Sequence, residues 1–304
     1  MADVVVAEGL TKTYGFRPVV DGLNLRVPEG CCYGLLGPNG AGKSTTLKML
    51  MGLIAPDAGR SSLLGEESQR LSPATLARCA YLAENHPLYR WMSIRQMTGF
   101  ARSFYPRFDD SLVAAIYDHF GLGWGQRIGR LSNGQRAQVS LALAVATDPE
   151  LLILDDPTLG LDPLVRRDFL ESLVQIIAKP GRTILFSSHI LSDVERVVDR
   201  IGILVDGSLR VDRPLDELKE RLRRVVLSFG NLPVPKTPTW PELVSAQRVD
   251  DRLELVVDGW SERVHAAALV LAPATLQVVE MDLDEIFVAY VGGSRAPLPA
   301  FGEA

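Results

Sequence analysis

Few cysteines, no excess of basic residues and no long apolar runs set the first limits on this chain. Its 304 residues contain only three cysteines, Cys31, Cys32 and Cys79. With no Cys or His pairs at metal-ligand spacing, we expect neither a disulfide framework nor a structural zinc site. The net charge is −5, which argues against nucleic acid as the main partner, because phosphate backbones are bound by basic surfaces.

The sequence also lacks the patterns of membrane insertion and secretion. No apolar stretch approaches the roughly 20 residues that a membrane-spanning helix needs. The amino-terminal MADVVVAEGLTK lacks the basic start and apolar core of a signal peptide. We therefore expect a cytoplasmic protein, and any role at a membrane must depend on a separate partner.

Alternating strand-like and helix-like segments predict an α/β fold with a mostly parallel sheet. Two segments near the amino terminus, VVVAEGLTKTYG and VVDGLNLRVPEG, alternate apolar and polar residues and predict edge strands of a small antiparallel sheet. Residues 86–146 have helical patterns and predict a helical subdomain. The strands of the parallel core are then expected in CCYGLL, ELLILDD, RTILFSS and RIGILVDG.

Composition changes after Arg224, where NLPVPKTPTWPE places four prolines in one short stretch. Such a stretch is typical of an irregular loop, so we expect one domain over residues 1–224 and a small α+β domain over 225–292. The second domain is predicted to contain a hairpin that turns at Asp250–Asp251. Its last helix should begin with a capping box formed by Asp282 and Glu285. Residues 293–304 are expected to be a loose tail.

The sequence GPNGAGKST, residues 37–45, matches the phosphate-binding pattern G-x-x-x-x-G-K-[ST]. Glycines let backbone N–H groups face phosphate oxygens, and the following helix directs its positive end at them. The alternative, a glycine-rich turn with an exposed lysine, is disfavoured by the strand before the motif and the helix after it. We therefore predict nucleotide-phosphate binding by Gly37, Asn39, Gly40, Gly42, Lys43, Ser44 and Thr45, with the Ser44 hydroxyl also on Mg²⁺.

Two adjacent aspartates end the apolar strand in ELLILDDPTLGLDP. Buried carboxylates are costly without a partner, and a phosphate-binding loop needs a carboxylate at a strand end to hold Mg²⁺. We assign this role to Asp155 and expect Asp156 to orient or deprotonate an attacking water. Asp156 has a second interpretation, as the cap of a helix that starts near Pro157, and both interpretations can hold.

Several motifs in a fixed order resemble those of the nucleotide-binding subunits of ATP-binding-cassette (ABC) transporters over about residues 4–225. LSNGQR, residues 131–136, is similar to the family's signature motif, and LLILDDP to its second nucleotide-binding motif. GLD, residues 160–162, resembles the loop that crosses the dimer interface, and YLAENHPLY lies where the family has its glutamine loop. FSSH ends at His189, where the family has its switch histidine.

The resemblance implies a P-loop NTPase fold and two ATP molecules sandwiched between two subunits arranged head to tail. Tyr14 takes the place of the aromatic residue that stacks on adenine, and His189 is expected to hydrogen-bond the γ-phosphate. The second cassette is a copy of this chain or a paralogue. Because the signature segment of one subunit covers the ATP of the other, the resemblance assigns nucleotide contacts across the interface to Ser132, Gly134, Gln135 and Asp162.

Three residues depart from the family pattern. Asp156 stands in place of the catalytic glutamate, and its side chain is shorter by one carbon–carbon bond, roughly 1.5 Å. A misplacement of ~1 Å can cost about a hundredfold in rate, so this change bears on the rate of hydrolysis more than on its kind. Glu84 replaces the loop glutamine and stays a catalytic and Mg²⁺-binding candidate, because it still offers a hard oxygen. Asn133 replaces a signature glycine.

We expect an ATPase subunit on the inner face of the cell membrane that powers a separate integral permease. The small C-terminal domain, the FYP at residues 104–106 and the ending DLDEIFVAYV resemble bacterial exporters of drugs, antibiotics or peptides. Residues 86–106 are rich in aromatic and Met residues. Trp91, Met92 and Phe100 therefore either dock the permease or form the core of the helical subdomain, because an apolar helical pattern fits both.

Other functions remain as alternatives. Asp156 prompts the hypothesis of a slow-hydrolysing regulatory ATP switch that is not coupled to transport. An ABC ATPase acting on nucleic acid or ribosomes is disfavoured by the acidic charge and the single cassette, and a P-loop kinase would leave LSNGQ and His189 without a role. Three histidines fit no pattern and are expected on the surface or on helices: His86, His119 and His265.

Overall fold

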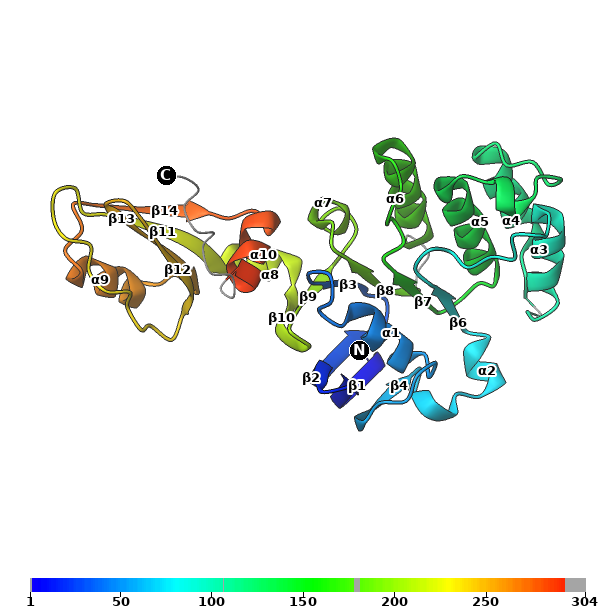
Figure 1. Cartoon of the computed structure of the whole chain (residues 1–304), viewed down its shortest axis with the longest axis horizontal. Helices are drawn as coiled ribbons and strands as arrows, with labels where there is room; N and C mark the ends of the chain where they lie inside the picture. Colours follow the sequence, from blue (N-terminus) through cyan, green and yellow to red (C-terminus); the bar gives the residue numbers. More distant parts are fainter. Residues whose placement is uncertain (1, 106, 178–180, 293–304) are drawn as a thin grey trace, which may run out of the picture. The chain divides into compact units, whose positions relative to one another are not determined.

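The computed structural model describes residues 2–105, 107–177 and 181–292 (Figure 1). It divides into two units, Met1–Asp212 and Arg213–Ala304. The division precedes the expected limit at 224/225, because α8 (Leu215–Arg221) and β11 (Leu222–Ser228) belong to the second unit. The proline-rich stretch that marked the expected limit lies inside that unit, between two of its strands. The expected tail, 293–304, lies outside the described residues.

A four-stranded antiparallel sheet begins the first unit, with strand order β2-β1-β4-β5. Its strands are β1 (Asp3–Tyr14), β2 (Arg17–Pro28), β4 (Ala58–Leu63) and β5 (Glu66–Glu67). The two alternating segments pair as predicted, but the edge position expected for the first of them is wrong. β1 is internal because β4 pairs with its other side, and the sequence of β4, AGRSSL, has too little apolar alternation to predict a strand.

A six-stranded sheet forms the centre of the first unit, in the order β10-β9-β3-β8-β7-β6. Five of these strands run parallel, from β6 through β7, β8 and β3 to β9. Every residue of β3, β7 and β8 is buried, which explains their continuous apolar runs. The six strands are β3 (Cys32–Leu36), β6 (Cys79–Leu82), β7 (Leu151–Asp155), β8 (Thr183–Ser188), β9 (Arg200–Val205) and β10 (Ser208–Pro214).

Helices and short turns connect the strands of the first unit. α1, α6 and α7 follow β3, β7 and β8 respectively, which places each helix start beyond the carboxyl end of a parallel strand. These parallel strand–helix units confirm the predicted P-loop NTPase fold. The connecting elements are α1 (Lys43–Leu50), η1 (Ser68–Arg70), α2 (Pro73–Leu76), α6 (Pro163–Ile177) and α7 (Leu191–Val194).

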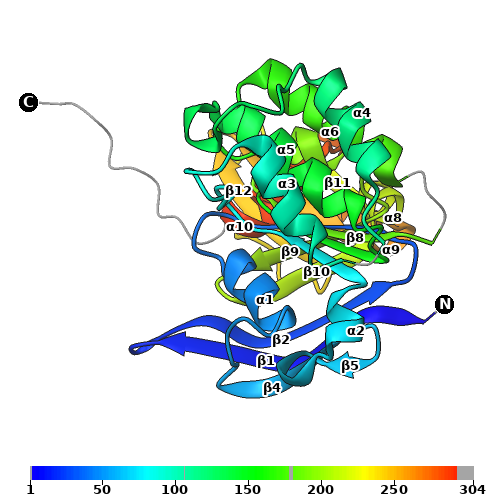
Figure 2. The same cartoon turned by 90° about the vertical axis from the view of Figure 1, so that its right-hand side faces the viewer.

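The predicted helical subdomain has a core of its own. It comprises α3 (Ile94–Arg102), α4 (Asp110–His119), η2 (Ile128–Arg130) and α5 (Asn133–Ala146). Buried apolar side chains from all three α-helices pack together, among them Ile94, Tyr117 and Val139. Figures 1 and 2 both place these helices at the end of the unit that lies away from the antiparallel sheet. No helix among the described residues is long and apolar enough to cross a membrane.

The second unit is a four-stranded antiparallel sheet, in the order β12-β13-β11-β14, with helices α8, α9 and α10. The predicted hairpin is confirmed, because β12 (Leu243–Val249) pairs with β13 (Arg252–Asp258) across Asp250–Asp251. The capping box is confirmed too, with Asp282 and Glu285 bonding each other's backbone at the start of α10. The remaining elements are α9 (Glu262–Val270), β14 (Thr275–Glu280) and α10 (Leu283–Val291).

Candidate functional site

The phosphate-binding loop joins β3 to α1 at the carboxyl edge of the parallel sheet. Gly40 and Gly42 have φ angles of 81° and 104°, which side-chain-bearing residues rarely adopt. A Cβ at Gly42 would also lie 2.4 Å from a backbone oxygen of β2, so glycine is required there. Lys43 Nζ donates to the carbonyl oxygens of Gly37 at 2.7 Å and Pro38 at 3.2 Å. The lysine ammonium is therefore held at the loop itself.

Three acidic side chains act on the Lys43 ammonium. Burial lowers the pKa of Lys43, and the negative charges of Asp156, Asp155 and Glu84 oppose that effect. Glu84 follows β6, while Asp155 ends the neighbouring β7 and Asp156 follows it. The structure thus brings the predicted lysine and the three predicted acidic residues into one site.

Ser44 and Asp155, two of the three residues predicted to hold Mg²⁺, are in direct contact. Ser44 Oγ donates to Asp155 Oδ1 at 2.8 Å. Among the described residues, no group of three or more His, Cys, Asp or Glu could hold a metal ion alone. One carboxylate and one hydroxyl leave the other positions around an octahedral ion to phosphate oxygens and water. This donor set fits Mg²⁺, which is usually held by one or two carboxylates together with substrate phosphates.

Two further hydroxyl groups bond the Asp155 carboxylate, and the sequence identified neither of them. Ser187 Oγ, on β8, donates to Oδ1 at 3.0 Å, and Tyr81 Oη, on β6, donates to Oδ2 at 3.2 Å. Burial, with the negative charge of Asp155, raises the pKa of Tyr81, so its hydroxyl keeps its proton. Ser187 lies in FSSH and Tyr81 in YLAENHPLY, but neither motif assigns a role to them. Only the sheet order β8-β7-β6 places both beside Asp155.

Asp156 has a left-handed backbone and two different carboxylate oxygens. Its φ is 46°, and its N–H donates to Ser187 Oγ at 3.0 Å. Oδ2 shares a hydrogen bond of 2.7 Å with His189 Nδ1, whereas Oδ1 is buried without a hydrogen-bond partner among the described residues. The helix-cap interpretation is wrong: residues 157–160 form a turn, and α6 begins only at Pro163.

The signature segment begins α5, with Ser132 as its N-cap. Ser132 and Gln135 form a capping box, in which each side chain accepts from the other's backbone N–H, at 3.1 and 3.0 Å. Gly134 packs against α6, because a Cβ there would lie 2.6 Å from Val165. Asp162 caps α6 by accepting from the backbone N–H groups of Leu164 and Val165. Within one chain, these side chains bond their own helices rather than the phosphate loop.

Two exposed aromatic residues lie at the turn between β1 and β2. Tyr14 is 53% exposed, and Phe16, which the sequence did not single out, is fully exposed. Lys12 Nζ lies 5.8 Å from the centre of the Tyr14 ring. This turn therefore offers two flat apolar faces to solvent, either of which suits stacking on a purine.

His86 is buried, so the expectation of a surface or helix position is wrong. It lies two residues after Glu84, in a loop, with a φ of 47°. Burial lowers its pKa to about 4, against a backbone hydrogen bond to Pro157 that acts in the opposite direction. A neutral imidazole therefore joins the loop after Glu84 to the turn that follows Asp156. No motif predicts this contact, because it depends on two loops that are distant in the sequence.

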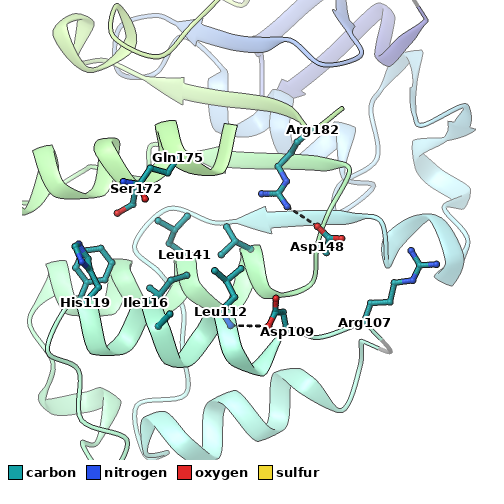
Figure 3. Close-up of a pocket in the computed structure, with 13 residues that line it drawn as sticks. Arg107, Asp109, Leu112, Ile116, His119, Leu141, Asp148, Ser172, Gln175 and Arg182 are labelled. Atoms are coloured by element: carbon teal, nitrogen blue, oxygen red, sulfur yellow. Dashed lines mark hydrogen bonds and ion pairs between the residues drawn. The ribbon is translucent and has the colours of Figure 1, made fainter. Parts of the chain in front are cut away.

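A separate cavity of about 600 Å³ lies between α4, α5 and α6. Figure 3 shows Leu112 and Ile116 of α4 on one side of it, near Leu141 of α5. Polar groups at its margin bond one another, since Arg182 pairs with Asp148 at 2.9 Å. None of the predicted site residues lines it, so it is distinct from the phosphate site.

Known proteins share both the sequence and the fold of this chain. The family model for ABC transporters matches residues 20–159. The ABC transporter ATP-binding protein YtrB of Bacillus subtilis (strain 168) is 30% identical over 289 residues, covering 94% of this chain and 97% of YtrB. The bacitracin transport ATP-binding protein BcrA of Bacillus licheniformis is 34% identical, with 74% of each protein covered.

Solved structures agree with the sequence relatives. The structure of an ATP-binding subunit of an ABC transporter superposes with a TM-score of 0.64 at 29% identity, covering 71% of this chain and 92% of the other. The phosphate loop, the paired aspartates and the signature helix thus occur in the fold in which ABC cassettes carry them. The chain belongs to the ABC transporter family, as an ATP-binding and ATP-hydrolysing subunit.

Proposed function

We propose that this subunit drives an exporter, as a dimer that hydrolyses ATP with Mg²⁺ on the inner face of the cell membrane, bound to a separate integral permease. Two hydrogen-bonded pairs at one edge of the sheet support ATP hydrolysis. Ser44 bonds Asp155, and His189 bonds Asp156. A relative named for Nod factor export supports the export direction, and one named for bacitracin transport supports a transport role.

In the proposed reaction, Lys43 and the N–H groups of the phosphate loop bind the β- and γ-phosphates. Ser44, Asp155 and Glu84 would hold Mg²⁺, which supplies positive charge to the phosphate oxygens when bound. The free Oδ1 of Asp156 accepts a hydrogen bond from the attacking water. Because His189 holds the other oxygen at 2.7 Å, the carboxylate keeps one orientation despite its shorter side chain.

A second subunit would complete the nucleotide site. Ser132 is exposed at the start of a 14-residue helix, and a helix start favours a phosphate group. Asp162 is exposed at the start of α6. In the proposed head-to-tail dimer, Ser132, Gly134 and Gln135 cover the γ-phosphate bound by the partner subunit, while Asp162 lies at the interface.

An aromatic cluster on the helical subdomain supports docking of the permease. Phe100 stacks edge-on against Tyr89 and Phe104, with ring centres 5.5 and 5.0 Å apart, and Tyr89 contacts Trp91 at 5.9 Å. All four rings are exposed, from 38% for Phe100 to 67% for Trp91. Contiguous exposed apolar patches of this kind usually mark interaction surfaces. We propose that the cluster binds an apolar helix of the permease.

Residues 86–106 include both core residues of the helical subdomain and surface residues that are available to dock the permease. Met92 packs with the core of the helical subdomain, whereas Trp91 and Phe100 lie on its surface. Of the FYP triplet, Phe104 belongs to the cluster, and Pro106 lies outside the described residues.

Co-purification tests this function directly. The tagged chain is co-expressed with the integral membrane protein encoded beside it, and the extracted membranes are assayed for the complex and for ATP hydrolysis. We expect a stable complex that contains two cassettes, and mass spectrometry then decides between two copies and a paralogue. A chain that hydrolyses ATP but stays wholly in the aqueous fraction would contradict the transport role and leave the ATPase intact.

The slow regulatory switch is the second candidate, and Asp156 is the observation that favours it. Asp156→Glu restores the longer side chain of the family pattern. A large rise in the rate of hydrolysis in Asp156→Glu would favour the slow switch. An equal or lower rate would favour a site already built around aspartate.

A further inference from the structure

We propose that Tyr81 is a positioning residue for Mg²⁺, because its hydroxyl fixes the orientation of the Asp155 carboxylate that ligates the ion. The proposal rests on the Mg²⁺ site described under the proposed function, and it adds Tyr81, to which the glutamine-loop resemblance assigns no role. It concerns how the ligand is held rather than which residue is the ligand.

The geometry holds the carboxylate from both sides. β7 lies between β6 and β8, and Tyr81 is level with Ile153 in the register of the first pair. Its hydroxyl reaches two residues along β7 to Asp155 Oδ2, at 3.2 Å. Ser187, directly beside Asp155 in the second pair, bonds Oδ1 at 3.0 Å. Each oxygen is therefore bonded by a hydroxyl from a different neighbouring strand.

Burial makes these hydroxyls important. Asp155 is fully buried, so solvent cannot replace a hydrogen bond that is lost, and an unsatisfied charged oxygen in the interior is costly. A tyrosine hydroxyl is also a neutral donor, which stabilises a carboxylate without adding a positive charge that would compete with Mg²⁺. Groups that orient metal ligands in this way typically contribute about 10–100-fold to metal affinity.

Tyr81 and Ser187 should differ in what they control. Tyr81 bonds only the carboxylate, whereas the Ser187 hydroxyl also accepts from the N–H of Asp156 at 3.0 Å. Loss of the Tyr81 hydroxyl should therefore weaken the response to Mg²⁺ and leave kcat at saturating Mg²⁺ near its original value. Loss of the Ser187 hydroxyl should lower both, because it also releases the backbone that carries Asp156.

The experiment measures binding of a non-hydrolysable ATP analogue to the full chain by calorimetry, once with Mg²⁺ and once with EDTA. In the unmodified protein, we expect Mg²⁺ to tighten binding by a measurable factor. In Tyr81→Phe, we expect that factor to fall by about 10-fold, with the affinity in EDTA unchanged. The phenylalanine ring keeps the packing of Tyr81 against the core, so the variant should fold, and thermal unfolding checks this.

Tyr33→Phe is the matched control, because it removes another tyrosine hydroxyl from the same sheet. Tyr33 Oη donates to Asp212 Oδ1 at 3.1 Å, and its loss should leave the Mg²⁺ factor unchanged. An unaltered factor in Tyr81→Phe, or an equal change in both variants, would overturn the positioning role while the Mg²⁺ site stands. If Mg²⁺ fails to tighten binding in the unmodified protein, the Mg²⁺ site itself is wrong and the proposal falls with it.

Discussion

The first unit contains two contrasting regions, the carboxyl edge of the parallel sheet and the aromatic surface of the helical subdomain. At the edge, charged groups are buried and nearly every oxygen is bonded, as Asp155 illustrates with three hydroxyl donors. On the surface, Tyr89, Trp91, Phe100 and Phe104 expose apolar rings to solvent. The buried edge has the order that positioned chemistry needs. The aromatic surface instead exposes apolar area to solvent, which a protein partner can cover.

The difference between the two regions begins with how each of them is encoded. The residues of the edge come from short motifs at strand ends, where a P-loop or a pair of aspartates has few other uses. The residues of the surface belong to helices whose apolar pattern fits a core and an interface equally well.

Asp156→Asn should abolish most hydrolysis while ATP still binds. The amide cannot accept a proton, and loss of a general base or water-orienting carboxylate typically costs about 10²–10⁴-fold in rate. Steady-state phosphate release and calorimetric ATP binding measure the two quantities separately. The exposed Asp118→Asn, on α4, is the control and should leave both unchanged. Hydrolysis at the original rate would make Asp156 structural, and another residue would have to position the water.

His86 lies between the two regions, and its burial predicts a pH dependence of stability. Its pKa is about 4 in the folded chain, against roughly 6.5 for an unperturbed histidine. Between these values the unfolded chain binds more protons, so stability should fall as pH drops from about 6.5 to 4. The full cost is on the order of 3 kcal/mol.

His86→Asn tests this dependence, since asparagine tolerates a positive φ and keeps a donor for Pro157. Urea unfolding at a series of pH values should show a shallower loss of stability below pH 6.5 in the variant. The solvent-exposed His119→Asn, on α4, should keep the original slope. An unchanged slope in His86→Asn would mean that His86 has the same pKa in the folded and the unfolded chain.

Some features of the fold and the site could be predicted from the sequence, and others could not. The P-loop and the Asp282 capping box could be predicted because each depends on residues close together in the chain. β4 could not, because AGRSSL forms a strand only through pairing with β1. Tyr81, Ser187 and His86 were missed for a related reason: their partners lie on other strands or loops, and side-chain type alone does not specify such contacts.

Trp91→Ala should weaken the complex with the permease and leave the isolated ATPase unaffected. Trp91 is the most exposed ring of the cluster, and loss of a large aromatic contact at an interface typically costs 1 kcal/mol or more, roughly fivefold or greater in affinity. Binding to detergent-solubilised permease measures the first quantity, and phosphate release by the isolated chain the second. Leu53→Ala, another exposed apolar residue, should bind normally. An equal loss of affinity in both variants would contradict the assignment of the docking site to the cluster.

Tyr14→Ala should have the smallest effect, and it tests exposed aromatic residues that lie outside the cluster. A ring that stacks on adenine contributes about 0.5–1.5 kcal/mol beyond its buried area, so ATP affinity should fall severalfold. Phe16→Ala is the matched variant, because Phe16 lies two residues away and is more exposed. If only Tyr14→Ala weakens binding, the adenine face belongs to Tyr14. If only Phe16→Ala does, the assignment from the family pattern is wrong. Either result would separate aromatics that bind nucleotide from those that bind protein, which exposure alone does not distinguish.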